Sequence, residues 1–144
     1  MINDPSFDLQ SFLPYLLNQA AEGSSLEFQR VYKERYSMLR SEWRVLFHLG
    51  IYNRMSAKEI SDKSKTHKTK VSRAVHKMQQ KGFVRRVPNQ EDRRKEWLEL
   101  TKSGLAAYED LHKLAQDYDQ VIQNKFLKQD VATFKKMLRV LACR

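Results

Sequence analysis

The chain has 144 residues, 31% of them charged, with a formal net charge of +10 and a mean hydropathy of -0.70. This length suits one domain with its own core, and no apolar run approaches the length that crosses a bilayer. The N-terminal MINDPSFD has neither a basic region nor a signal-peptide core, so we expect a cytoplasmic protein without membrane association. Cys143 is the single cysteine, which excludes an internal disulfide and a cysteine-based metal cage.

The first predicted element is a long helix over about residues 6–33. Apolar residues between Phe7 and Tyr32 recur at helical spacing and give a wide apolar face. Pro14 should either kink this helix or mark its first turn. Gly23 should weaken it midway, because glycine is a poor helix former.

A connection over residues 35–40 should lead to a second helix over residues 42–51. Ser41 is the predicted N-cap, since a serine hydroxyl can accept a free backbone N–H at a helix start. Trp43 and Phe47 fall on one face of this helix. Aromatic side chains in this position more often fill a core than contact a ligand.

A helix over residues 56–63 follows, and it begins with a capping box. Ser56 is the N-cap and Glu59, three residues later, can reach back to it. Ile60 supplies the main apolar contact. Residues 64–67 have the composition of a turn.

The next helix, over residues 68–81, has one apolar and one basic face. Its narrow apolar stripe consists of Val71, Ala74, Val75 and Met78, and the opposite face carries Thr69, Arg73, His76 and Gln80. Gly82 stands where a helix C-terminus needs a left-handed residue. The pattern predicts a helix that packs with one face and presents the other to a partner.

A β-hairpin is predicted directly after this helix. Strands over residues 83–87 and 95–100 flank a turn rich in polar residues, and Leu98 and Leu100 lie on one face of the second strand. A short helix, a turn, a basic helix and a basic hairpin are typical of a winged helix-turn-helix that binds double-stranded DNA.

The charge distribution supports a polyanionic partner. Residues 54–95 contain 14 Lys and Arg against 4 Asp and Glu, whereas the rest of the chain has 13 of each. A single charged run is usually a solvated face. Here the entire net positive charge of the chain is confined to one motif, which favours binding to nucleic acid instead.

Two more helices complete the chain, the first from a cap at Thr101 or Ser103 to about residue 126, the second over residues 130–141. Both carry apolar stripes that a domain of this size cannot cover. A second copy of the chain would cover them, so we expect a homodimer. The predicted fold is mainly α with a small β-hairpin wing, formed by a single domain over residues 1–144. Its winged helix-turn-helix spans about residues 41–101, and its dimerisation helices span about 6–36 and 103–144.

Within the basic helix, the residue types suggest different contacts with DNA. Arg73 can bind guanine through two hydrogen bonds, and Thr69 can contact a base edge or a thymine methyl group. The other candidates are better suited to phosphates or lie beside the base readers; they are Lys68, Lys70, Ser72, His76 and Lys77. Arg86 in the hairpin is a further candidate.

Other functions remain open at this point. The four histidines lie on different segments without partners at metal-ligand spacing, and no phosphate loop or nucleophile motif occurs, so we expect no metal, cofactor or catalysis. An architectural DNA-binding protein would also be basic. A helical adaptor would suit the amphipathic ends but not the basic hairpin.

The motifs resemble the MarR (multiple antibiotic resistance regulator) family over about residues 38–110. Asp92-Arg93-Arg94 matches the family's D-x-R in the wing, and the run from Leu100 to Gly104 matches its L-T-x-x-G. The resemblance implies a transcriptional regulator, most commonly a repressor, that binds a palindromic operator as a dimer. It also implies that Arg94 enters the minor groove and that Asp92 pairs with a basic residue to hold the hairpin.

Members of this family commonly bind small aromatic acids between the dimerisation helices and the DNA-binding motif. The resemblance therefore implies a small aromatic or anionic effector. The matching residues are Tyr15, Gln19, Trp43, Phe47 and Tyr108. Each of them also suits an ordinary core position.

Overall fold

The computed structural model describes residues 4–143, which form six α-helices, a short 3-10 helix and a three-stranded antiparallel sheet. In chain order the elements are η1 (Leu9–Ser11), α1 (Leu13–Tyr36), α2 (Arg40–Tyr52), β1 (Arg54–Met55), α3 (Ala57–Ser64), α4 (Lys68–Gln80), β2 (Val84–Pro88), β3 (Glu96–Leu100), α5 (Lys102–Gln123) and α6 (Lys128–Ala142).

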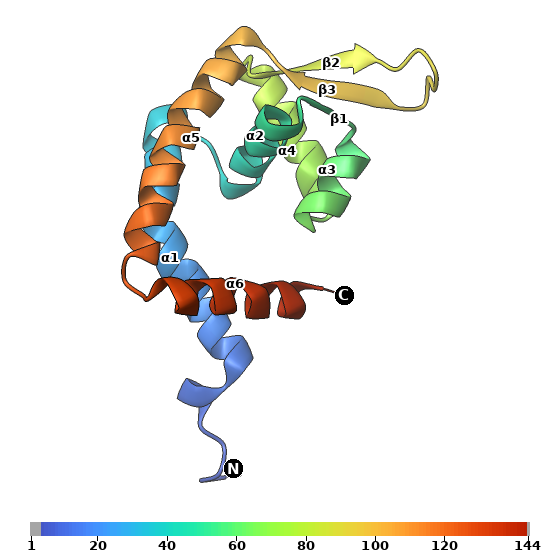
Figure 1. Ribbon diagram of the computed structural model, residues 1–144. Coiled ribbons are helices and arrows are strands. Elements are labelled where there is room, and N and C mark those ends of the chain that lie inside the picture. The colour runs from blue at the N-terminus through green and yellow to red at the C-terminus, as the bar shows by residue number, and fades with distance from the viewer. Residues whose placement is uncertain (1–3, 144) are drawn as a thin grey trace.

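The helices and the hairpin form two distinct regions (Figure 1). Helices α2, α3 and α4 cluster under the sheet, and the hairpin of β2 and β3 projects beyond them. Helices α1 and α5 pack side by side at the other end, and α6 turns away from α5. This confirms the predicted fold class, which is mainly α with a small β-hairpin wing between long N- and C-terminal helices.

The first helix begins later and ends later than its sequence pattern predicted. Helix α1 covers Leu13–Tyr36, and Pro14 lies in its first turn, where its missing N–H leaves no hydrogen bond unmade. Gly23 does not interrupt the helix. Ser37 ends it in a left-handed conformation, with φ of 54°.

The predicted N-cap of the second helix was wrong. Helix α2 begins at Arg40, so Ser41 lies inside it and Leu39 occupies the N-cap position. The Glu42 carboxylate accepts the backbone N–H of Leu39 at 3.1 Å and supplies the capping hydrogen bond from within the helix. This is the half of a capping box that the third helical residue supplies, and the apolar Leu39 side chain cannot supply the other half.

The helix-turn-helix follows the prediction closely. Ser56 Oγ accepts the N–H of Glu59 at 3.1 Å at the start of α3. The four residues of the predicted apolar stripe on α4 are all buried. Gly82 has φ of +80° after the end of α4, as the C-terminal position required.

The sheet contains one strand that the sequence analysis missed. Strand β1 has two residues, which is too short to show a period, and it pairs with β3 so that Arg54 lies opposite Glu99. Strands β2 and β3 form the predicted hairpin, with Val84 opposite Leu100 and Pro88 opposite Glu96. The strand order is β1-β3-β2, so β3 joins the hairpin to the helices.

Polar contacts join α1 to α5. The Tyr36 hydroxyl donates to Asp110 at 2.6 Å, and Arg35 binds the same carboxylate at 3.0 Å. Burial, together with the hydrogen bond to Asp110, raises the pKa of Tyr36 to about 12. Tyr36 therefore remains a neutral donor at physiological pH.

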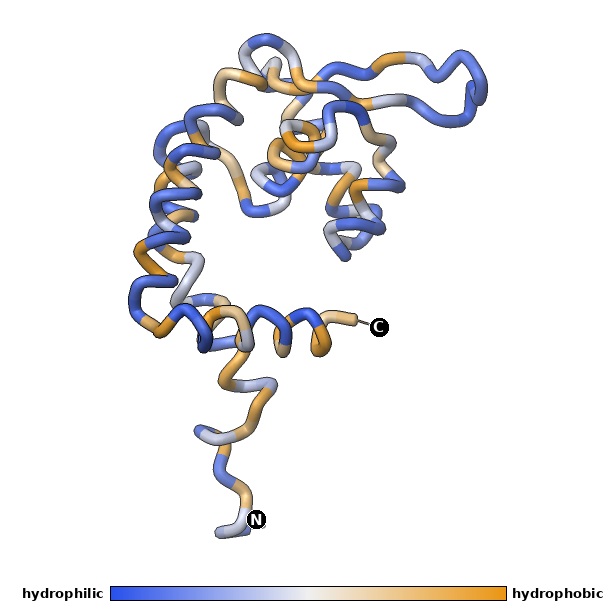
Figure 2. The backbone as a smooth tube through the Cα atoms, viewed as in Figure 1, coloured by the Kyte–Doolittle hydropathy of each residue, from blue (hydrophilic) through white to orange (hydrophobic). Residues whose placement is uncertain are grey.

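Apolar surface remains exposed on the outer helices. Helix α6 contains no buried residue, and Figure 2 shows apolar segments along α6 and the N-terminal part of α1, away from the core. The exposed large apolar side chains of α6 are Phe134, Met137, Leu138, Val140 and Leu141. Among the helices of residues 4–143, none is long and apolar enough to cross a membrane.

Gly104 allows α5 to start against the end of α4. Thr101 Oγ1 accepts the N–H of Gly104 at 3.0 Å and donates to the carbonyl of Gly82 at 2.6 Å. A Cβ atom on Gly104 would collide with the backbone carbonyl of Phe83. Steric exclusion of a Cβ atom thus explains why the last residue of the L-T-x-x-G motif is glycine.

Gly104→Ala should destabilise the protein by about 1–3 kcal/mol, because the added methyl group forces the backbone of α5 away from Phe83. Gly23→Ala is the matched control, since nothing lies within 4 Å of a Cβ at Gly23. It should stabilise α1 by about 0.5–1 kcal/mol. Thermal and urea unfolding measure both changes, and a stabilising Gly104→Ala would contradict the steric account.

Candidate nucleic-acid interface

Helix α4 presents a face of unpaired polar side chains. His67 is its N-cap, with Nδ1 accepting the N–H of Thr69 at 3.1 Å. Within residues 4–143, no hydrogen bond or ion pair engages the side chains predicted here as DNA contacts: Lys68, Thr69, Lys70, Ser72, Arg73, His76 and Lys77. All seven residues are exposed. Their donors are therefore available to an external partner.

The wing carries one predicted contact residue, Arg86, on the side of α4. Its Nε donates to Gln79 Oε1 at 3.0 Å, and its Nη1 lies 3.0 Å from Glu96 Oε2. Gln79 thus joins α4, the recognition helix of the helix-turn-helix, to the wing. The sequence analysis had not singled out Gln79, because only the folded hairpin brings it near Arg86.

The tip of the wing holds Asp92 and Arg94. The resemblance implied that Asp92 pairs with a basic side chain, but in the described part of the chain it instead accepts the backbone N–H of Arg94 at 3.0 Å. Asn89 accepts the N–H groups of Glu91 and Asp92 at 3.0 and 3.2 Å. These hydrogen bonds shape the turn, and Arg94 remains exposed at its tip.

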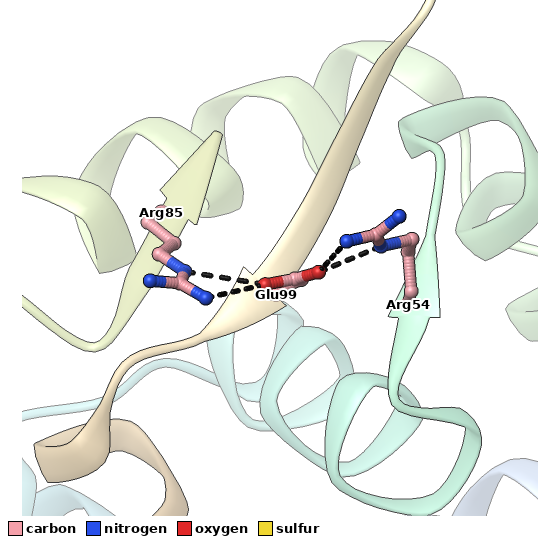
Figure 3. A network of polar contacts seen from close by, with 3 residues as sticks. All are labelled: Arg54, Arg85 and Glu99. Carbon is pink, nitrogen blue, oxygen red and sulfur yellow. Dashed lines mark hydrogen bonds and ion pairs between the residues drawn. The ribbon is translucent and has the colours of Figure 1, made fainter. Parts of the chain in front are cut away.

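A network of three charged residues ties the sheet together (Figure 3). Arg85 on β2 binds Glu99 on β3 at 2.7 Å, and Arg54 on β1 binds the other oxygen of the same carboxylate through Nε at 2.6 Å. Hydrogen bonds from both arginines lower the pKa of Glu99, and the bond from Arg85 has the larger effect. The contribution of these pairs to stability is therefore present above the usual glutamate pKa and is lost as the pH falls through the lowered value.

The network shows which arginines hold the strands together and are therefore not available to bind DNA. Successive residues of a strand point to opposite faces, so Arg85 and Glu99 face away from the side on which Arg86 meets α4. The sequence pattern alone could not separate the roles of Arg85, Arg86 and Arg93. The structure assigns Arg85 and Arg54 to holding the strands together.

An ion pair to a buried carboxylate fixes the C-terminal end of α4. Glu42 is 2% exposed, and its Oε1 lies 2.6 Å from Lys81 Nζ, which also donates to the carbonyl of Ser37 at 2.6 Å. From the sequence alone, Lys81 was equally consistent with an exposed lysine that only aids solubility. It connects the recognition helix to the junction of α1 and α2.

Three of the five predicted ligand residues come together in an aromatic cluster. The ring centroids of Trp43 and Phe47 are 4.9 Å apart, and those of Phe47 and Tyr108 are 5.3 Å apart. Phe28 of α1 packs on Trp43 at 5.4 Å. Trp43 Nε1 is buried without an acceptor among the described residues.

The other two predicted ligand residues lie away from this cluster within one chain. Tyr15 and Gln19 are on the N-terminal half of α1, and Tyr15 precedes Phe28 by 13 residues. At about 1.5 Å per residue, this places Tyr15 roughly 20 Å along the helix from the contact with Trp43. Among residues 4–143, no three side chains of His, Cys, Asp or Glu gather as metal ligands.

A helix-turn-helix with an exposed basic recognition helix and a basic hairpin defines a winged-helix DNA-binding protein. The family model described as "MarR family" matches residues 36–95. A curated relative, the uncharacterized HTH-type transcriptional regulator YwoH of Bacillus subtilis, is 25% identical over 107 residues, which are 74% of this chain and 77% of YwoH.

Solved structures share the fold over nearly the whole chain. A mutant of Escherichia coli MarR in complex with operator DNA has a TM-score of 0.83 and 22% identity, with 96% of this chain and 99% of that chain covered. NadR in complex with 4-hydroxyphenylacetate has a TM-score of 0.78 and 18% identity, with 99% of this chain and 98% of that chain covered. Together with the family match over residues 36–95 and the curated relative, they show that the chain has the winged-helix fold of MarR-family transcriptional regulators and is similar to members of that family.

Glu99→Gln should weaken DNA binding even though it removes a negative charge and so makes the wing one unit more positive. The substitution removes the carboxylate that Arg54 and Arg85 bind, so the ion pairs that connect β1 and β2 to β3 are lost. We expect a loss of about 1 kcal/mol in the free energy of unfolding, as for a surface ion-pair network. DNA affinity, measured by fluorescence anisotropy, should fall.

Glu91→Gln is the matched control, because Glu91 is exposed in the wing and its carboxylate has no partner among the described residues. It adds the same charge without breaking a contact and should strengthen DNA binding slightly through Coulomb attraction. Equal gains in affinity for both variants would show that the Glu99 network does not position the wing.

Proposed function

We propose that the chain is a sequence-specific repressor that acts in the cytoplasm as a homodimer on a palindromic operator. The observation that carries this proposal is the exposed face of α4, whose seven predicted contact residues have no protein partner within residues 4–143. The complex of MarR with operator DNA supports the same use of this fold.

The roles proposed for the individual side chains follow from their chemistry and position. Arg73 and Thr69 lie at the centre of the exposed face and are proposed to contact base edges. Lys68, Lys70, His76 and Lys77 are proposed to bind phosphates, which fix the register without reading the sequence. Exposed Arg94 is proposed to enter the minor groove.

A homodimer explains the apolar surface of the outer helices. Helix α6 buries none of its residues within one chain, and α1 exposes Leu13, Leu16 and Leu26. A two-fold dimer through these helices would cover both surfaces and leave two recognition helices free. Such helices bind half-sites that lie about one DNA turn apart.

Selection of bound duplexes from a random pool tests the proposal. We expect enrichment of two inverted half-sites with centres about 10 base pairs apart, and a complex of two chains per duplex by analytical ultracentrifugation. An architectural protein would enrich no motif, and a helical adaptor would retain no duplex. Either result would refute the proposal.

Arg73→Ala should reduce affinity for the selected duplex by about 1–3 kcal/mol and relax the preference at one position of each half-site. Lys77→Ala should weaken selected and random duplexes alike, because a phosphate contact carries no sequence information. Competition titrations against single-base variants measure both effects. If the two variants weaken all duplexes equally, Arg73 does not read a base.

A second proposal, favoured by one buried atom, is release of DNA by a small aromatic or anionic ligand. Trp43 Nε1 is an unsatisfied donor inside an aromatic cluster with Phe47 and Tyr108. A phenol or carboxylate lodged there could accept this hydrogen bond while its ring stacks. NadR, which shares the fold, was solved with 4-hydroxyphenylacetate.

The alternative is that the rings are ordinary core, and a titration with ligands separates the two. Aromatic carboxylates should quench the fluorescence of Trp43 saturably, raise the melting temperature and lower DNA affinity at matching concentrations. Nearly complete release needs about 5.5 kcal/mol of differential affinity between the two states. Trp43→Phe, which leaves Trp97 as the single tryptophan, should abolish the quenching. Stabilisation without loss of DNA affinity would contradict the regulatory proposal.

A further inference from the structure

A cationic groove runs beside the recognition helix. It has a volume of about 550 Å³ and separates the first turns of α2 from α4. The basic residues that line it are Arg40, Arg44, Lys65, Lys70, Arg73 and Lys77. Its lining contains one carboxylate, Glu42, and that carboxylate is already paired with Lys81. Two of these six cations have other partners, since Lys65 donates to the carbonyl of Ala142 and Arg40 to Ser25, so the cations that face an anion in the groove are Arg44, Lys70, Arg73 and Lys77.

The groove and the wing lie on opposite flanks of α4. At about 100° per residue, Lys70 and Gln79 project roughly 180° apart around the helix. Gln79 contacts Arg86 of the wing, whereas Lys70 and Lys77 line the groove. The proposed base-reading face lies between the two flanks.

The dimensions of B-DNA indicate which part of the duplex each flank of α4 would face. A helix about 10–12 Å wide fills a major groove about 12 Å wide, so each flank of a recognition helix faces one of the two phosphate backbones. The wing lies beside one of them. We infer that the groove between α2 and α4 binds the other backbone strand, with Arg44 as an additional phosphate contact; this rests on the proposed DNA-binding function.

Arg44 is positioned for this role by the turn before α4. Its Nη1 donates to Thr66 Oγ1 at 3.3 Å, so the guanidinium is held near the start of the recognition helix, and its other donors have no partner among residues 4–143. Arg40 is turned toward α1, where its Nη2 lies 3.4 Å from Ser25 Oγ. Arg44 precedes the segment that holds the charge excess, so the sequence pattern did not indicate it.

Salt dependence measures the contact. Each neutralised phosphate contributes about 0.9 to the slope of log K against log salt concentration, so Arg44→Gln should reduce the slope by about 0.9 on selected and random duplexes alike. Arg44→Lys should retain the slope because it keeps the charge. Lys113→Gln, which removes one exposed charge from α5, should leave the slope unchanged. A slope that Arg44→Gln leaves unchanged, or changes only as Lys113→Gln does, would overturn the inference.

A scan with uncharged methylphosphonates locates the strand. Neutralising the phosphate that Arg44 contacts should weaken the wild-type protein but no longer affect Arg44→Gln. That position should lie on the strand across the major groove from the one at which Lys68→Gln becomes insensitive, because Lys68 is a proposed phosphate contact on the flank of α4 that faces the wing. The same strand for both variants would overturn the inference.

Two further measurements keep the outcome unambiguous. Lys70→Gln changes an exposed side chain without a partner in the described residues, so it can replace Arg44→Gln if that variant unfolds. Inorganic phosphate at constant ionic strength should not displace DNA; displacement that Arg44→Gln abolishes would indicate a site for free anions and overturn the backbone contact. Because random duplexes suffice for the slope, a lack of sequence preference would contradict the proposed function alone.

Discussion

The ion pair between the buried Glu42 and Lys81 is the constraint on which the position of the recognition helix depends. Removing a carboxylate from water is costly, and this one is compensated by Lys81 Nζ at 2.6 Å and by the N–H of Leu39 at 3.1 Å. The same ammonium group binds the carbonyl of Ser37 at the end of α1. Loss of Lys81 would leave the buried Glu42 carboxylate without its cation, so this ion pair favours one relative arrangement of the three helices.

This constraint explains how a strongly basic motif remains ordered. The cations divide into those that carboxylates neutralise, such as Lys81, Arg85 and Arg54, and those without a partner in residues 4–143, such as Arg73 and Lys70. The first group holds the helix and the strands in position. The second group faces the side that DNA is proposed to occupy, where counterion release would favour binding.

Local patterns predicted the helix-turn-helix well because its determinants are local. The stripe of α4, the cap at Ser56 and the left-handed Gly82 each follow from residues within one or two turns. Contacts between distant segments could not be predicted in this way. The Glu42 cap, the pairing of β1 and the network around Glu99 depend on which elements the fold brings together. The position of Tyr15 relative to Trp43 likewise depends on how far α1 extends beyond the core.

The central claim is that the face of α4 binds duplex DNA both electrostatically and by sequence. The most direct measurement is affinity against salt concentration for a selected duplex and a scrambled duplex of the same length. The account predicts that log K falls linearly with log salt for both duplexes, and that the selected duplex binds about 1,000-fold or more tightly throughout. Affinity that does not depend on salt, or equal affinity for the two duplexes, would contradict it.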